Sequence, residues 1–174
     1  MLNLKYQNTR DRAIGLGGMA VAMVVWDNEE YFAGLDLDAE ADNGLALSPD
    51  FFAVHNSNLS AKAVWNDRVT KFQIGLGLLV ANVLSRALVN FHEEITPQLR
   101  QTLVKRLQDE GRYACDLTDN EVEALFSKAY GYFHSVFGHH VVGSLVTTIA
   151  DALETDRRLD RDRVLEILAP LYRQ

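Results

Sequence analysis

The sequence predicts a mainly helical α+β domain, in which an N-terminal β-hairpin or small antiparallel sheet packs on a bundle of about five helices. Three observations predict this fold class. Residues 61–94 form one long, mostly apolar helical pattern, two short apolar runs flank a polar turn before residue 38, and capped amphipathic stripes follow residue 96. A helix that is apolar over most of its circumference has to be wrapped by other elements, so we expect the long helix to be central.

The hairpin is predicted from residues 19–37. Residues 19–26 are rich in Val, Met and Ala, and residues 27–30 form a polar turn cluster. In residues 31–37, apolar side chains recur at every second position. Two such runs around a polar turn favour antiparallel strands. Residues 45–47 are expected to add a third short strand, and because a lone hairpin is marginally stable, the strands must pack on the helices.

The long helix is expected to begin at a cap provided by Ser60, after a short helix that starts at Ser48-Pro49 and a break at residues 56–58. Its apolar side chains recur at spacings of three and four, at Trp65, Val69, Phe72, Leu76, Leu79, Val83, Ala87 and Phe91. This stripe predicts that Leu79 and Val83 are almost fully buried. Polar residues interrupt the run, and an arginine at mid-span, Arg86, is costly in a bilayer, so we expect a core helix rather than a membrane span.

The second half of the chain is predicted to be helical throughout. One helix runs from Thr96-Pro97 to a stop at Gly111. The next starts at a capping box formed by Thr118 and Glu121 and continues until Gly138 ends or bends it. Two further stripes cover residues 142–153 and, after a cap at Asp160, the last part of the chain.

Composition indicates one globular domain over residues 1–174, which is β-rich over 1–47 and helical over 48–174. The net charge of −7 argues against a sequence-independent nucleic-acid-binding surface, which needs clustered Lys and Arg. The single cysteine, Cys115, excludes an internal disulfide, and the N-terminal residues lack an apolar core of signal-peptide length. We therefore expect a cytoplasmic protein with no nucleic-acid and no membrane partner.

Three local features bring a functional site to mind, but each lacks the motif or the structural context that the site needs. Residues 15–20 fit G-x-G-x-x-A, but polar residues precede them where a dinucleotide site needs a strand, so we expect a glycine turn that leads into the hairpin. Alternating carboxylates at residues 36–42 fit no EF-hand register and favour a solvated strand edge. Cys115 lies in no catalytic cysteine motif and is expected to be a small core residue.

A histidine cluster is the first candidate ligand-binding set. His134, His139 and His140 lie close together in the sequence among several aromatic residues. Two histidines that share a metal on one helix are usually four residues apart, whereas His134 and His139 are five apart. A bend at Gly138 would be needed to bring them together, so we expect no bound metal.

A polar seam on the long helix is the second candidate. Asn82, Arg86 and Asn90 are spaced four apart, and Glu93 continues the same strip. Because an unpaired polar group costs free energy when it is buried, Arg86 is expected to need a carboxylate partner, and Asp151 and Glu154 are the candidates. The alternatives are an internal hydrogen-bond seam, the exposed strip of the helix, a contact surface for another chain, or a pocket wall that presents Arg86 to an anionic ligand.

Two functional hypotheses follow. Because the sequence contains no catalytic motif and implies no cofactor, we expect a non-enzymatic protein-interaction or self-associating module, either a homo-oligomer or the partner of another protein. The alternative is a small-molecule-binding protein or enzyme with a pocket near Arg86 and the histidine cluster. An exposed apolar patch would favour the first hypothesis, whereas a concave pocket with converging polar groups would favour the second.

Overall fold

The computed structural model describes residues 2–40, 43–53 and 60–173. The α-helices are α1 (Thr9–Val25), α2 (Pro49–Phe52), α3 (Ala61–Ser85), α4 (Pro97–Cys115), α5 (Asp119–Gly138), α6 (His140–Asp156) and α7 (Arg161–Leu168). The strands are β1 (Phe32–Asp36), β2 (Leu45–Leu47) and β3 (Arg158–Asp160). Short 3₁₀ turns cover Glu29–Tyr31 (η1) and Ala169–Arg173 (η3), and a π-helical segment, η2 (Arg86–Phe91), extends α3.

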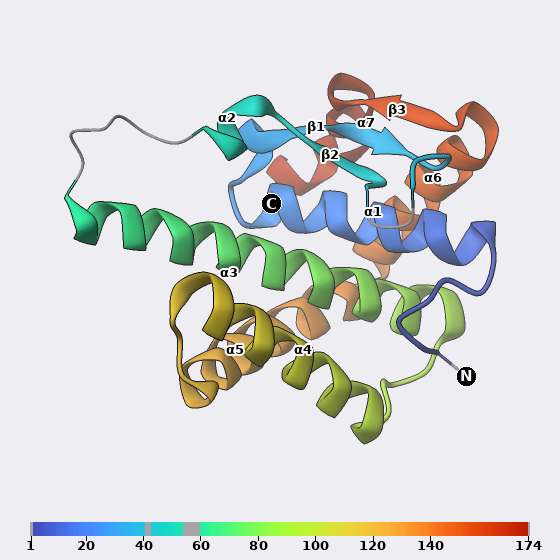
Figure 1. Cartoon of the computed structure of the whole chain (residues 1–174). Helices are drawn as coiled ribbons and strands as arrows, with labels where there is room; N and C mark the ends of the chain where they lie inside the picture. The colour runs from blue at the N-terminus through green and yellow to red at the C-terminus, as the bar shows by residue number, and fades with distance from the viewer. Residues whose placement is uncertain (1, 41–42, 54–59, 174) are drawn as a thin grey trace.

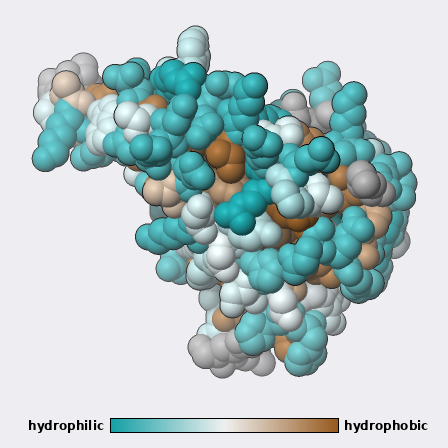
Figure 2. Space-filling view, turned by 90° about the horizontal axis from the view of Figure 1, so that it is seen from below, coloured by the Kyte–Doolittle hydropathy of each residue, from teal (hydrophilic) through white to brown (hydrophobic). Residues whose placement is uncertain are grey.

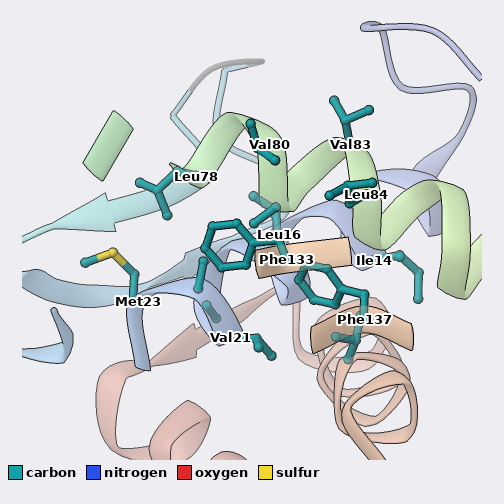
Figure 3. Close-up of a cluster of buried hydrophobic side chains, with 14 of the residues drawn as sticks. Ile14, Leu16, Val21, Met23, Leu78, Val80, Val83, Leu84, Phe133 and Phe137 are labelled. Carbon is teal, nitrogen blue, oxygen red and sulfur yellow. The ribbon is translucent and has the colours of Figure 1, made fainter. Parts of the chain in front are cut away.

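Helices α1 and α3 lie side by side at the centre of the molecule (Figure 1). The sheet, α6 and α7 lie on the α1 side, while α4 and α5 pack on the opposite side of α3. The core is therefore formed chiefly where α1, α3 and α5 meet. Figure 3 shows this cluster, to which α1 contributes Ile14, Leu16, Val21 and Met23, α3 contributes Leu78, Val80, Val83 and Leu84, and α5 contributes Phe133 and Phe137.

The sheet is antiparallel with the strand order β2-β1-β3. Leu35 in the central strand lies opposite Leu45 on one side and Leu159 on the other. The mainly helical α+β class and the strand at residues 45–47 are confirmed. The remaining strand, β3, comes from the C-terminal half of the chain and has only three residues, of which Asp160 is the last, so no alternating pattern predicted it.

The prediction of a strand at residues 19–26 is wrong, because these residues form the second half of α1. Strand β1 pairs with β2 instead. A continuous apolar run suits both a buried strand and a buried helix, and α1 is buried on nearly every side. The sequence does contain a signal for the start of α1, because asparagine is a favoured N-cap residue. In the structure the Asn8 side chain caps α1 by accepting a hydrogen bond from the backbone N–H of Asp11 at 2.9 Å.

The glycines of residues 15–18 are interior positions of α1 rather than a turn, which corrects the expected glycine turn. A Cβ at Gly18 would lie 2.1 Å from Ser85 Oγ, and one at Gly15 would lie 2.6 Å from Asn82 Nδ2. A Cβ at Gly17 would lie 3.1 Å from the Val146 carbonyl oxygen on α6. These glycines therefore let α1 approach α3 and α6 closely, which accounts for them without a nucleotide.

The long central helix is confirmed, although its last part is the π-helical segment η2. His92 follows this segment as its C-cap, in the left-handed conformation with φ of 53°. Val83 is buried as expected, whereas Leu79 is only half-buried because it faces a surface groove. Within the described residues, α3 with η2 is long and apolar enough to cross a membrane, and α5 with α6, bent by 85°, could count as a second span. Of the apolar window in α3 and η2, 67% is buried inside the molecule, as in a core helix.

The starts of α3, α5 and α7 follow the predicted caps. Ser60 accepts a hydrogen bond from the N–H of Ala63, and Thr118 and Glu121 form the reciprocal capping box. Asp160 caps α7, and Gly138 ends α5 before the sharp bend into α6. The predicted stop at Gly111 is wrong by one turn. Helix α4 continues to Cys115, and Gly111 is instead a buried contact point against Val122 and Phe72. The predicted break at residues 56–58 lies outside the described residues.

Candidate functional site between helices α1 and α3

A fully buried ion pair joins α1 to α3 at the start of η2. Arg86 donates from Nε to Asp11 Oδ1 at 2.8 Å and from Nη2 to Asp11 Oδ2 at 2.7 Å, and neither side chain is exposed to solvent. Such a two-pronged contact matches the planar guanidinium to the carboxylate. Asp11 is therefore the partner of Arg86. The predicted partners, Asp151 and Glu154, bind Arg10 at 2.6 and 2.8 Å instead.

Asp11 also anchors the N-terminal strap, by which we mean residues 2–8. The carboxylate accepts a hydrogen bond from the N–H of Gln7 at 2.9 Å, and Arg86 Nη2 donates to the Lys5 carbonyl at 3.0 Å. Asn90 Nδ2 reaches Asp11 Oδ1 at 3.5 Å. Two members of the predicted seam, Arg86 and Asn90, thus converge on one carboxylate. The positive charge of Arg86 is directed at Asp11 inside the molecule.

Tyr6 links the strap to the third member of the seam. Its ring lies 4.8 Å from the Arg86 guanidinium, and its hydroxyl accepts a hydrogen bond from Asn82 Nδ2 at 2.8 Å. Burial raises the pKa of the Tyr6 phenol, although the Asn82 hydrogen bond and the charges of Arg86 and Arg12 oppose this. The phenol therefore keeps its proton at neutral pH and retains an O–H donor beside Asn82.

A groove lies beside this polar cluster, between the strap, α1, α3, α4 and the loop that enters β2. Its volume is about 890 Å³, which is within the range of ligand sites. The walls of the α1–α3 groove are mainly apolar and are formed by Leu4, Leu16, Met19, Gly44, Leu45, Gly75, Leu78, Leu79 and Val83. The polar lining residues are Tyr6 and Asn82, and the charged ones are Lys5 and Arg106.

Five positions of α3 line this groove at spacings of three and four, from Gly75 to Val83. They form one face of the helix that is about 12 Å long, at 1.5 Å per residue. The same face explains why Leu79 is half-buried. It is also where Gly75 leaves open space, since a Cβ there would have no heavy atom within 4 Å.

Two smaller hollows lie elsewhere on α3. One, of about 440 Å³, lies between the end of α1, α3 and α5 and is lined by Trp26, Ile74, Leu125, Ala129 and Tyr132, among others. The other, of about 480 Å³, lies between α3 and the end of α4 and includes Phe72, Tyr113 and Cys115. Burial raises the pKa of the Cys115 thiol, which keeps it protonated and agrees with the expected role as a small core residue.

The three histidines do not converge. His134 Nε2 lies 2.9 Å from Glu94 Oε1, and its ring stacks on Tyr130. His139 and His140 are exposed at the bend between α5 and α6. Among the described residues no group of three His, Cys, Asp or Glu side chains is placed to hold a metal ion. The carboxylates of Asp36 and Asp38 pair with Arg158 and Arg157, respectively. The predicted strand edge is wrong, because Asp36 ends β1, which is the central strand of the sheet.

Sequence reasoning missed Tyr6, Asp11, Lys5 and Arg106. The pattern Asn8-x-x-Asp11 at a helix start was a usable signal for Asp11, but nothing local marks a carboxylate that pairs 75 residues away. The other three residues share only their position around the groove.

The chain matches no protein-family model, no curated protein and no solved structure.

Proposed function

We propose that this protein binds a small apolar molecule in the α1–α3 groove. The observation that carries the proposal is the groove itself, an apolar channel with the Tyr6–Asn82 pair at its wall. This combination of apolar walls and a few fixed polar groups is typical of ligand sites. It is a revised form of the small-molecule hypothesis, with Asn82 in the lining, Arg86 behind it, and the histidines elsewhere.

The aromatic side chains of α5 are largely covered within one chain. Phe126, Phe133 and Phe137 are buried, and Tyr130 is covered by the guanidinium of Arg100 at 4.7 Å. Viewed from below, the molecule is mostly hydrophilic, with hydrophobic atoms confined to small areas and hollows among polar side chains (Figure 2). These features favour the ligand-binding hypothesis over a large interface on this face.

A glycine pair provides a direct test of the groove. Gly75 and Gly131 are both interior helix positions at which a Cβ would have no heavy atom within 4 Å, but only Gly75 lines the groove. We expect Gly75→Phe to weaken binding of the neutral fluorophore N-phenyl-1-naphthylamine at least about tenfold, or about 1.4 kcal/mol, because the ring occupies the groove. Gly131→Phe should bind the fluorophore as the wild type does.

Fluorescence titration measures the affinity, and thermal melts check that both variants fold. Each substitution removes a helical glycine and should not lower helix stability. Equal binding by the two variants, or no saturable binding by the wild type, would contradict the proposed function.

A second candidate function is the protein-interaction or homo-oligomeric role, and one end of the molecule favours it. Trp65 is 45% exposed and Tyr113 is 96% exposed. The Trp65 indole donates to the Cys115 carbonyl at 2.9 Å, which places both aromatic side chains where α3 begins and α4 ends. Aromatic residues are enriched in interfaces, so we propose this end as the contact surface. The cytoplasmic location and the absence of nucleic-acid and membrane partners stay predictions.

Self-association should be visible in light scattering. If the Trp65–Tyr113 end is an interface between two copies, the mass should rise toward twice that of the chain with increasing concentration, and Tyr113→Ser should shift that rise to higher concentration. Tyr172→Ser provides the control, because Tyr172 is 52% exposed on η3, which packs on α7 rather than on α3 or α4. A single-chain mass at the highest soluble concentration would exclude the homodimer.

A further inference from the structure

The charges around the α1–α3 groove are of one sign. The chain has a net charge of −7, with 24 acidic residues and 17 Lys and Arg. Nevertheless, both charged residues that line the groove, Lys5 on the strap and Arg106 on α4, are cations. A groove with apolar walls and only positive charge at its lining is complementary to a molecule with an apolar chain and a negative head.

Lys5 and Arg106 are both exposed, so their charges are open to a ligand at the mouth of the groove. Arg106 Nε contacts Glu110 one helical turn away at 3.0 Å, and Glu110 lies outside the groove lining. An exposed pair of this kind is weak and leaves the other guanidinium nitrogens available to a second acceptor. Lys5, the cation on the strap, takes no part in the Arg106–Glu110 pair.

Tyr6 and Asn82, the polar pair of the groove, line the same groove as the two cations. Tyr6 follows Lys5 in the strap, and its hydroxyl accepts from Asn82 while retaining its own proton as a donor. A carboxylate accepts hydrogen bonds through both oxygens, so a single head group can use a cation and the Tyr6 hydroxyl together. The apolar chain would then lie along the face of α3 from Leu79 and Val83 toward Gly75.

We propose that the ligand is an alkyl carboxylate, with its chain in the α1–α3 groove and its carboxylate held by Lys5, Arg106 and the Tyr6 hydroxyl. This inference rests on the proposed function and names the ligand class for the same site. The charge of the head group, rather than the length of the chain, is what separates this ligand from other apolar molecules.

The test compares two ligands with the same chain, laurate and 1-dodecanol, in displacement of N-phenyl-1-naphthylamine. We expect wild-type protein to bind laurate more tightly than dodecanol, and added NaCl to reduce this difference. Lys5→Gln and Arg106→Gln should each weaken laurate binding up to about fivefold, and the double variant about tenfold, with dodecanol unchanged. Lys105→Gln is the matched control, because Lys105 is exposed on α4 but lies outside the groove lining.

The outcomes separate the two levels of the proposal. If laurate and dodecanol bind equally and Arg106→Gln and Lys5→Gln change neither, the carboxylate inference is wrong, while loss of both ligands in Gly75→Phe still supports the groove. If neither ligand displaces the fluorophore and Gly75→Phe changes nothing, the proposed function itself is wrong. If Lys105→Gln weakens laurate as much as Arg106→Gln does, the effect is one of general surface charge and the assigned site is overturned.

Discussion

Replacing Asp11 with alanine is expected to lower the free energy of unfolding by about 3–5 kcal/mol, because it leaves the Arg86 guanidinium buried without its counter-charge. Both side chains are fully buried, and the carboxylate also accepts the N–H of Gln7, so the substitution removes the anchor of the N-terminal strap as well. Chemical denaturation monitored by tryptophan fluorescence measures the loss.

The paired substitution Asp11→Leu with Arg86→Met distinguishes a charge effect from a packing effect. It removes both charges and keeps apolar volume at both positions, and such replacements of buried pairs are often neutral or stabilising. We therefore expect the double variant to recover most of the stability that Asp11→Ala loses. A double variant as unstable as the single one would show that the geometry of the pair, rather than its charge balance, holds α1 and α3 together.

The pair also bears on binding, because the strap that Asp11 anchors supplies Leu4, Lys5 and Tyr6 to the groove. The ion pair and the lining residues therefore have different roles. Arg86 and Asp11 hold the strap in place, and Leu4, Lys5 and Tyr6 of the strap line the groove. Helix α3 also has two different faces: Leu84 is buried in the core, whereas Leu79 lines the groove.

The starts of the main helices after residue 48 were predictable because caps and stripes are local signals. Ser60, Thr118 and Asp160 each cap the helix that follows, as a serine, threonine or aspartate before an apolar stripe predicts. The N-terminal half of the fold was harder, because α1 is surrounded by other elements and its apolar run has no polar face to give a helical period. The partner of Leu35 on β3 comes from the far end of the chain, which no local pattern shows.

The candidate site was predictable only in part, because its residues come from distant parts of the chain. The spacing of Asn82, Arg86 and Asn90 identified a polar seam, since residues four apart share a helix face. Their partners, Asp11 and Tyr6, lie near the N-terminus, and pairing at this separation depends on the tertiary fold. The apolar run at residues 19–26 suits a strand as well as a helix, and only the cap residue Asn8 indicates the helix start that places Asp11 on α1.

Two leucines on α3 should respond very differently to the same substitution. Leu84 is 1% exposed in the core between α1 and α3, so Leu84→Ala is expected to cost about 2–5 kcal/mol through lost burial and a residual cavity. Leu79 is half-buried and borders the groove, where solvent replaces the missing atoms, and Leu79→Ala should cost less than about 1.5 kcal/mol. Urea melts of both variants give the comparison. Equal losses would mean that the α1–α3 groove is closed in solution and that Leu79 belongs to the core, which would remove the basis for a ligand there.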